Sequence, residues 1–201
     1  IALEMIDDII LKNSKQFSLT EIPKMIFIAE FAADTKDEVE EKLEFFKKSL
    51  EKENIGYKRE CMTDEKEMSA IWNIRKAGLG ILLSKKSYSR AIAFIEDLSI
   101  PPEKLYAFMS KFQAYLEKIG KTAGIYGHVG SGCMHIRPYI DLRRQEEIET
   151  LNQIMLDVAE LVLEQGGALS GEHGDGLIRS WLTQKMFGKR LTEAFIAIKH
   201  A

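Results

Sequence analysis

Cysteine is scarce in this chain of 201 residues, which contains only Cys61 and Cys133. Neither belongs to a CxxC pair, so a zinc ribbon and a thioredoxin-type redox motif are excluded. A chain of this length can bury a core without disulfides or metal staples. We therefore expect reduced thiols and a cytoplasmic setting.

Long apolar runs are also missing, and none approaches the roughly 20 residues that a membrane-spanning helix needs. The chain starts Ile1-Ala2-Leu3-Glu4, which has neither an initiator Met nor the charge pattern of a signal peptide. We therefore expect a part excised from a longer protein. Peripheral attachment of that parent protein to a membrane stays open.

There is no excess of basic charge. The chain carries 28 Lys and Arg against 31 Asp and Glu, with a net charge of -3 and a pI near 5.9. The two signs are interspersed, so no electrostatic footprint favours nucleic acid or an anionic membrane as a partner.

Several catalytic signatures are absent: the P-loop, GxGxxG after a strand, the GxSxG elbow and the HExxH helix. Nucleotide hydrolysis, dinucleotide binding by this segment and serine hydrolase chemistry are therefore not supported. Internal repeats, low-complexity segments and linkers are missing too, which favours a single domain over residues 1–201.

The apolar patterns predict a mixture of strands and helices. Leu3 to Leu11 has the spacing of a short helix or an ordered lead-in. Strands are expected at Met25–Phe31, Tyr57–Met62, Ala91–Ile95, Thr122–His128 and Met134–Ile140. Helices are expected after the capping boxes Thr35/Glu38 and Asp64/Glu67, from Pro101 to Gly120, from Arg143 to Gln165 and from Leu177 to Met186.

This order predicts an α+β fold. It resembles a ferredoxin-like antiparallel sheet with helices packed on one face, an inserted helix and a C-terminal helical extension.

Two histidines flank a glycine-rich turn in the stretch Gly127-His128-Val129-Gly130-Ser131-Gly132-Cys133-Met134-His135. If Gly130–Cys133 is a four-residue turn closed by Val129 and Met134, His128 lies directly opposite His135 and both project from one face. Such a pair can hold a metal ion when further ligands are present. The alternative is two polar strand histidines beside a flexible turn.

A second dense stretch, Ser170-Gly171-Glu172-His173-Gly174-Asp175-Gly176, offers a carboxylate and a third histidine. With His128 and His135, Glu172 completes a set that suits zinc, manganese or iron and leaves positions open for substrate. His173 would then be a general base beside the ion, and Cys133 a pocket-wall group. The alternative is a glycine-rich surface loop.

An arginine stands on the apolar face of the helix that follows Asp64. Arg75 falls among Ile71, Leu79 and Leu82, where an unpaired guanidinium is costly. It must reach a carboxylate, a cavity or a ligand, and spacing alone favours an internal salt bridge. Arg137 has the same strand parity as His135 and would share its face.

With these residues assembled, the chain resembles the C-terminal, substrate-side domain of FAD-linked oxidases, which include D-lactate, D-2-hydroxyglutarate and glycolate dehydrogenases. The resemblance spans nearly the whole chain. Its anchors are Ile71–Arg75, Glu96-Asp97 with Pro101, Gly127–His135 and Gly171–Gly174. His135–Pro138, Gly171–Gly176 and Lys185–Gly188 look most like the large bacterial members that fuse a flavin unit to an iron–sulfur region.

The resemblance implies a divalent metal held by His128, His135 and Glu172, with His173 taking the substrate hydroxyl proton while hydride passes to flavin N5. It also implies that Arg75 anchors the carboxylate of a small 2-hydroxy acid. Cys133 stands where the family has an Asn that contacts substrate, and Ser131 replaces an Asp of the family's turn.

The family's flavin-binding domain is not among these residues, and no cysteine cluster is present for iron–sulfur centres. FAD would therefore be bound mainly by another domain of the same parent chain, and iron–sulfur clusters would lie elsewhere in that parent. We expect the isolated chain to lack turnover.

Three functions follow as hypotheses. The first is the substrate- and metal-binding cap of an FAD-dependent D-2-hydroxyacid dehydrogenase. The second is a flavin-independent metal hydrolase that uses the same His-His-Glu set. The third is a non-catalytic ferredoxin-like interaction module.

Overall fold

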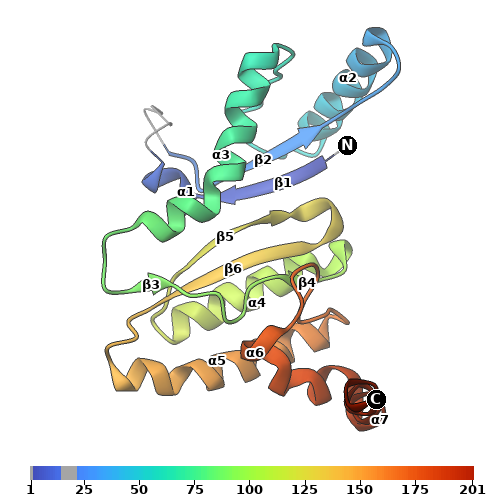
Figure 1. Cartoon of the computed structure of the whole chain (residues 1–201). Helices are drawn as coiled ribbons and strands as arrows, with labels where there is room; N and C mark the ends of the chain where they lie inside the picture. The colour runs from blue at the N-terminus through green and yellow to red at the C-terminus, as the bar shows by residue number, and fades with distance from the viewer. Residues whose placement is uncertain (1, 15–21) are drawn as a thin grey trace.

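The computed structural model describes residues 2–14 and 22–201, and these form an α+β fold around a six-stranded sheet (Figure 1). Strands run in the order β2 (Met25–Glu30), β1 (Ala2–Asp7), β5 (Ala123–His128), β6 (Cys133–Ile140) and β3 (Arg90–Ala91), and β4 (Leu98–Ser99) also pairs with β6. Every strand pair is antiparallel. The predicted α+β class with an antiparallel sheet is therefore confirmed.

Leu3–Leu11, predicted as a short helix or an ordered lead-in, spans most of the strand β1 (Ala2–Asp7) and the start of a helix after it. Strand β1 lies between β2 and β5. Helix α1 (Asp8–Asn13) follows at once, capped by the Asp7 carboxylate, which accepts from the Ile10 N–H at 2.9 Å. A strand buried on both faces and joined directly to a helix has no clean period in sequence.

Helices cover both faces of the sheet, so the prediction that they pack on one face is wrong. Helices α4 (Leu105–Lys118) and α5 (Gln145–Glu164) share a core with Met5, Met134 and Ile136. On the other face, α1 and α3 (Glu65–Ser84) pack with Ile6 and Tyr126. The second layer arises because β1 and β6 (Cys133–Ile140) place large side chains on both faces.

Two predicted strands do not form as expected. Residues 57–62 are irregular rather than a strand, and all but the partly buried Met62 are exposed. In place of Ala91–Ile95 there are two short strands, β3 (Arg90–Ala91) and β4 (Leu98–Ser99), both paired with β6. Phe94 and Ile95 are buried but lie outside the strands. The apolar run that contains them therefore indicates burial, and it does not indicate the backbone hydrogen bonding of a strand.

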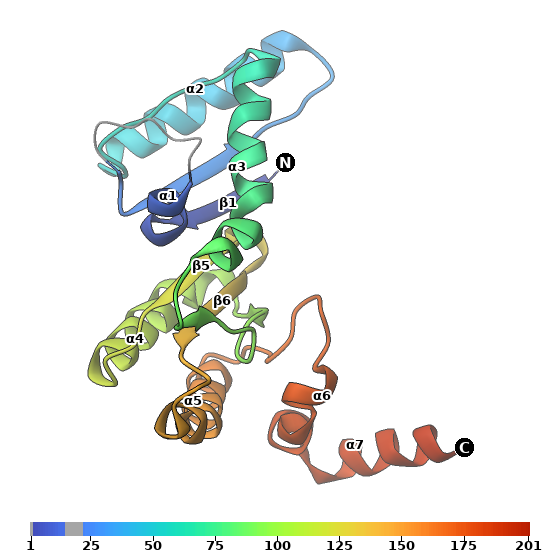
Figure 2. The same cartoon turned by 60° about the vertical axis from the view of Figure 1, so that its left-hand side comes forward.

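The capping box predicted for α2 (Lys36–Lys52) is present, with the Thr35 hydroxyl and the Glu38 carboxylate each bonding the other's backbone N–H. The predicted helix Leu177–Met186 is instead divided into α6 (Gly176–Arg179), a 3-10 turn η3 (Ser180–Leu182) and the start of α7 (Thr183–His200). Helix α7 extends away from the sheet and forms the predicted C-terminal helical extension (Figure 2).

The β5–β6 hairpin is closed by the 3-10 turn η2 (Val129–Ser131) and by Gly132, whose φ is 75°. A Cβ at Gly132 would lie 1.7 Å from the carbonyl oxygen of Ile100, just before the turn η1 (Pro102–Lys104), so only glycine fits there. Across residues 2–14 and 22–201, none of the helices combines the length and apolar character that a bilayer span requires.

Candidate active and metal site

The two hairpin histidines share a face, but they are not directly opposite each other as predicted. His128 pairs with Cys133, and His135 pairs with Tyr126. The turn therefore comprises Val129–Gly132, and the register is shifted by two residues relative to the predicted turn Gly130–Cys133. A shift of two preserves the side-chain face, so the rings still meet diagonally, with centroids 5.4 Å apart.

A third imidazole joins them from the segment between α5 and α6. The ring of His173 stacks on that of His135 with centroids 5.1 Å apart. The Glu172 carboxylate lies between the rings: its oxygens are 3.5 Å from Nε2 of His128, 3.7 Å from Nε2 of His135 and 4.0 Å from Nε2 of His173. Three imidazole nitrogens thus converge on one carboxylate.

A buried glutamate lies behind His128. Glu4 of β1 stands directly across from His128 on β5, and its Oε1 is 2.7 Å from His128 Nδ1. Its Oε2 accepts a hydrogen bond from Arg75 Nε at 2.8 Å. Arg75 also stacks over the Tyr126 ring, with its guanidinium carbon 4.9 Å from the centroid. The internal salt bridge predicted for Arg75 is therefore confirmed.

A second buried glutamate lies beside the other two rings and is within hydrogen-bond distance of His173. Glu96 Oε1 is 2.8 Å from His173 Nδ1, and its Oε2 lies 3.7 Å from His135 Nδ1 and accepts from Arg137 Nη2 at 3.1 Å. Burial by itself would raise the pKa of Glu96, but His135, His173 and Arg137 together lower it to about 2. Arg137 shares the face of His135, as its strand parity predicts.

The loop that carries Glu172 and His173 is anchored by Asp97, which is fully buried and has a φ of 70°. Its carboxylate accepts from Ser170 Oγ at 2.7 Å, from the Glu172 N–H at 3.0 Å and from the His173 N–H at 2.8 Å. Burial raises the pKa of Asp97, but these hydrogen bonds outweigh burial and lower it. A non-glycine residue in this backbone region is strained and typical of functional sites.

Cys133 lies beneath the same loop and is buried. Its Sγ is 3.4 Å from Asp97 Oδ1, and a Cβ added at Gly171 would lie 3.0 Å from it. Burial, and next the hydrogen bond to Asp97, raise the pKa of the Cys133 thiol to about 12. The thiol is therefore held in its neutral form and helps to support the loop. Contact between Cys133 and substrate stays a prediction.

Among residues 2–14 and 22–201, one group of four side chains has ligand atoms close enough to share an ion: one such atom from each of Asp97, His135, Glu172 and His173 lies within 4.8 Å of the others. His135 and Glu172 were both predicted as ligands. His128 is outside this group, although its Nε2 also faces Glu172. Asp97 is a poor ligand because both of its oxygens already accept hydrogen bonds.

The donor set fits a divalent metal such as zinc, manganese or iron, since it combines imidazole nitrogens with a carboxylate. Nδ1 of His128 and of His173 each bond a buried carboxylate, so Nε2 is the atom left to face Glu172. A histidine that donates its other ring N–H to a carboxylate is the usual arrangement behind a metal.

The three histidines, Glu172 and Arg75 can be picked out from the sequence as site candidates, but the role of Glu4 appears only in the structure. The signal available was its parity: Glu4 interrupts an apolar run on the same strand face as the buried Ile6. Another buried arginine, Arg179 of α6, donates from its guanidinium to the carbonyl oxygens of Glu96 and Gly174. Arg179 thereby connects the segment that carries Glu96 to the loop that carries Glu172 and His173.

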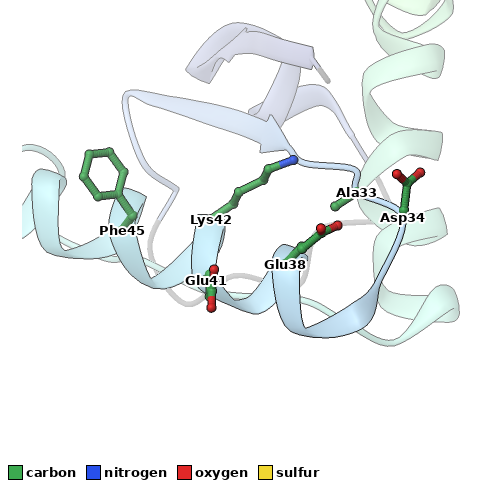
Figure 3. Close-up of a pocket in the computed structure, with 6 residues that line it drawn as sticks. All are labelled: Ala33, Asp34, Glu38, Glu41, Lys42 and Phe45. Carbon is green, nitrogen blue, oxygen red and sulfur yellow. The ribbon is translucent and has the colours of Figure 1, made fainter.

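A separate groove lies along α2, away from the histidines, and is lined by Ala33, Asp34, Glu38, Glu41, Lys42 and Phe45 (Figure 3). Its polar groups serve local structure. Glu38 belongs to the capping box, and Lys42 donates to the carbonyl oxygen of Ala32 at 2.9 Å. The groove contains no histidine or cysteine.

Residues 1–201 match the family described as FAD linked oxidases, C-terminal domain. The chain is 34% identical over 179 residues to a D-2-hydroxyglutarate dehydrogenase of Haemophilus influenzae, covering 86% of this chain and 17% of that protein. It is 32% identical over 168 residues to a D-2-hydroxyglutarate dehydrogenase of Pseudomonas putida, covering 82% of this chain and 16% of that protein.

A more distant similarity is to the glycolate oxidase subunit GlcD of Bacillus subtilis, at 26% identity over 137 residues, 68% of this chain and 28% of that subunit. The match over all its residues shows that the chain belongs to the C-terminal domain family of FAD linked oxidases. It spans less than a third of the length of these three relatives.

Proposed function

We propose that this chain is the substrate- and metal-binding part of an FAD-dependent dehydrogenase that oxidises a D-2-hydroxy acid to a 2-oxo acid. The observation that carries the proposal is the convergence of three imidazole Nε2 atoms on the Glu172 carboxylate, with buried carboxylates behind the rings. Membership of the FAD linked oxidase family and the names of its relatives support the redox chemistry.

In this proposal His128, His135 and Glu172 hold a divalent metal, which would make the hydroxyl group of the substrate more acidic. FAD, bound mainly by another part of the parent protein, would supply the hydride acceptor. The substrate loses the hydride from its α-carbon and the proton from its hydroxyl oxygen, and becomes the 2-oxo acid.

His173 is the proton acceptor in this scheme. Its side chain is 45% exposed, against 36% for His128 and 5% for His135, so it is the most accessible of the three rings. Glu96 holds its Nδ1, which leaves Nε2 as the atom that takes the hydroxyl proton. Arg75 anchors the carboxylate of the substrate, as a guanidinium can do with two parallel hydrogen bonds.

The full-length protein, purified with its flavin, tests this function. We expect D-2-hydroxyglutarate, D-lactate or glycolate to reduce the flavin under anaerobic conditions, with a divalent metal present in the protein. Failure of the whole panel would contradict the dehydrogenase. Metal-dependent hydrolysis that proceeds without flavin would instead favour the hydrolase, and protein that binds neither metal nor hydroxy acid would favour the interaction module.

A further inference from the structure

Glu4 is a buried carboxylate whose two oxygens serve two different parts of the site. Oε2 accepts from Arg75 Nε at 2.8 Å, and Oε1 lies 2.7 Å from His128 Nδ1. Only 6% of Glu4 is exposed, so water does not compete strongly for either oxygen. Each partner comes from a different element, Arg75 from α3 and His128 from the end of β5.

The three elements are held in fixed relation at this point. Glu4 and His128 are direct cross-strand partners in the β1–β5 pair, so their side chains lie on the same face. On the helix side, Ile74, the neighbour of Arg75, is buried in the same core as Ile6 of β1. Glu4 therefore occupies the junction between the helix that carries Arg75 and the strand that carries His128.

Hydrogen-bond chemistry then fixes how His128 is protonated. An ionised carboxylate only accepts hydrogen bonds, and a guanidinium only donates them. With both oxygens of Glu4 accepting, the proton of the neutral imidazole is on Nδ1. Nε2 keeps its lone pair and faces Glu172.

We propose that Glu4 is a positioning residue that sets two functional groups at once, the Nε2 lone pair of His128 toward the metal and the guanidinium of Arg75 toward the substrate carboxylate. The inference rests on the proposed function. It goes beyond that function because one residue, which touches neither metal nor substrate, links the strength of metal binding to that of substrate binding.

Glu4→Gln tests this link because an amide can accept on one side only. Arg75 cannot accept, so the amide oxygen of Gln must face Arg75 and the amide N–H₂ must face His128 Nδ1. His128 then has to accept at Nδ1 and carry its proton on Nε2, where the proton blocks metal ligation. An almost isosteric change thus reverses the tautomer of a ligand.

The matched control is Glu30→Gln. Glu30 lies in β2, next to β1, and its carboxylate accepts from Trp72 Nε1 of α3 at 3.1 Å. An amide oxygen can accept from the same indole, so this variant changes the same residue type beside the same helix without disturbing His128. A second variant, Glu4→Gln with Arg75→Met, removes the arginine and frees the amide oxygen to accept from His128 Nδ1.

The measurement uses the full-length flavoprotein with Mn²⁺. Metal affinity is found by competition with a fluorescent chelator, and KM for the best hydroxy acid is found at saturating Mn²⁺. We expect Glu4→Gln to weaken Mn²⁺ binding by about 10- to 100-fold and to raise KM by about tenfold. Glu30→Gln should match wild type in both, and the double variant should recover most of the metal affinity while KM stays raised.

Two results would overturn the inference. The first is a Glu4→Gln variant whose metal affinity and KM equal those of wild type. The second is a double variant whose metal affinity stays as low as that of a folded Glu4→Gln variant. If Glu4→Gln does not fold, the double variant decides, because it contains neither member of the buried ion pair. It must then bind Mn²⁺ within about threefold of wild type. Wild-type protein that binds no metal would overturn the proposed metal site itself, and the positioning role with it.

Discussion

At the scale of single residues, Asp97 holds the loop of residues 170–173 in place. It accepts hydrogen bonds from a side chain and two backbone N–H groups of residues 170–173. Asp97→Asn keeps the volume but offers one acceptor oxygen, so donors on the other side would face an N–H₂ group. We expect this variant to lower the free energy of unfolding by about 2–4 kcal/mol, since hydrogen bonds to charged groups are each worth about 1.5–3 kcal/mol.

Chemical denaturation of the chain measures this loss. Asp157→Asn is the matched control, because Asp157 lies in α5, outside this loop, and accepts from Tyr115 Oη at 2.8 Å and from Gln153 Nε2 at 2.7 Å. The control should cost less than about 1 kcal/mol. Equal losses in the two variants would show that Asp97 has no special role.

The site residues divide into those that sequence reveals and those that it does not. His128, His135, Glu172 and His173 stand in short glycine-rich stretches, where their chemistry is visible locally. Glu4 contacts Arg75 and His128 across 71 and 124 positions of the chain. Apolar periodicity can indicate that the Glu4 carboxylate is on a buried face. It cannot identify Arg75 and His128 as its partners, because only tertiary packing brings them together.

At the scale of elements, two glycines should respond oppositely to alanine. Gly132 closes the β5–β6 turn at φ 75°, with the Ile100 carbonyl in the way of a Cβ. Gly80 lies exposed in α3, where a Cβ would meet nothing within 4 Å. We expect Gly132→Ala to destabilise the chain by at least about 2 kcal/mol and Gly80→Ala to stabilise it by about 1 kcal/mol.

Thermal melting of both variants checks the prediction, and Gly80→Ala serves as the control for the loss of a glycine as such. A Gly132→Ala variant that melts with wild type would mean that the turn does not have the described conformation.

The junction of β1 and α1 should make stability depend on pH. Asp7 is buried, and burial raises its pKa from 3.8 to about 6 despite hydrogen bonds from the N–H groups of Ile10 and Ile125. Asp8 adds repulsion, and Tyr139 faces the same carboxyl group. Because the folded pKa exceeds the unfolded one, the folded state holds more protons between about pH 4 and pH 6. Stability should therefore fall as pH rises through that window, by up to about 3 kcal/mol.

Urea unfolding at pH 4 and pH 7 tests this, with Asp7→Asn as the comparison because the amide does not ionise. Other groups contribute equally to both proteins, so the difference between their pH dependences isolates Asp7. The same pH dependence in both proteins would contradict the raised pKa.

Element types were more predictable than pairing. The Thr35/Glu38 capping box and the β5–β6 hairpin are where the sequence places them, because caps and alternation are local signals. At the second predicted box, Asp64 caps α3 with its side chain, which accepts from the N–H groups of Lys66 and Glu67. The hairpin register differs by two residues because Val129 lies in the turn η2 and not in a strand. Close packing of Gly132 against the Ile100 carbonyl fixes this turn. The Tyr57–Met62 strand fails because alternation cannot supply a neighbouring strand.

At the scale of the whole molecule, the site is built where separate layers meet. Histidines come from the central β5–β6 hairpin and from the loop before α6, while Glu4 and Arg75 come from β1 and α3 (Figure 1). The three relatives compared above are more than three times as long as the aligned part of this chain. The chain therefore corresponds to only part of the length of these relatives.

The most direct test of the proposed dehydrogenase is anaerobic reduction of the flavin in the full-length protein by D-2-hydroxyglutarate. The rate of reduction is measured by stopped-flow absorbance after the protein and the acid are mixed. Variant His173→Gln keeps a hydrogen bond to Glu96 but removes the base, and His200→Gln changes the exposed fourth histidine as a control. We expect wild type and His200→Gln to reduce the flavin at the same rate and His173→Gln to be slower by about 10²- to 10⁴-fold. Reduction at the wild-type rate in His173→Gln would contradict its role as the base, and no reduction by any D-2-hydroxy acid in wild type would contradict the function itself.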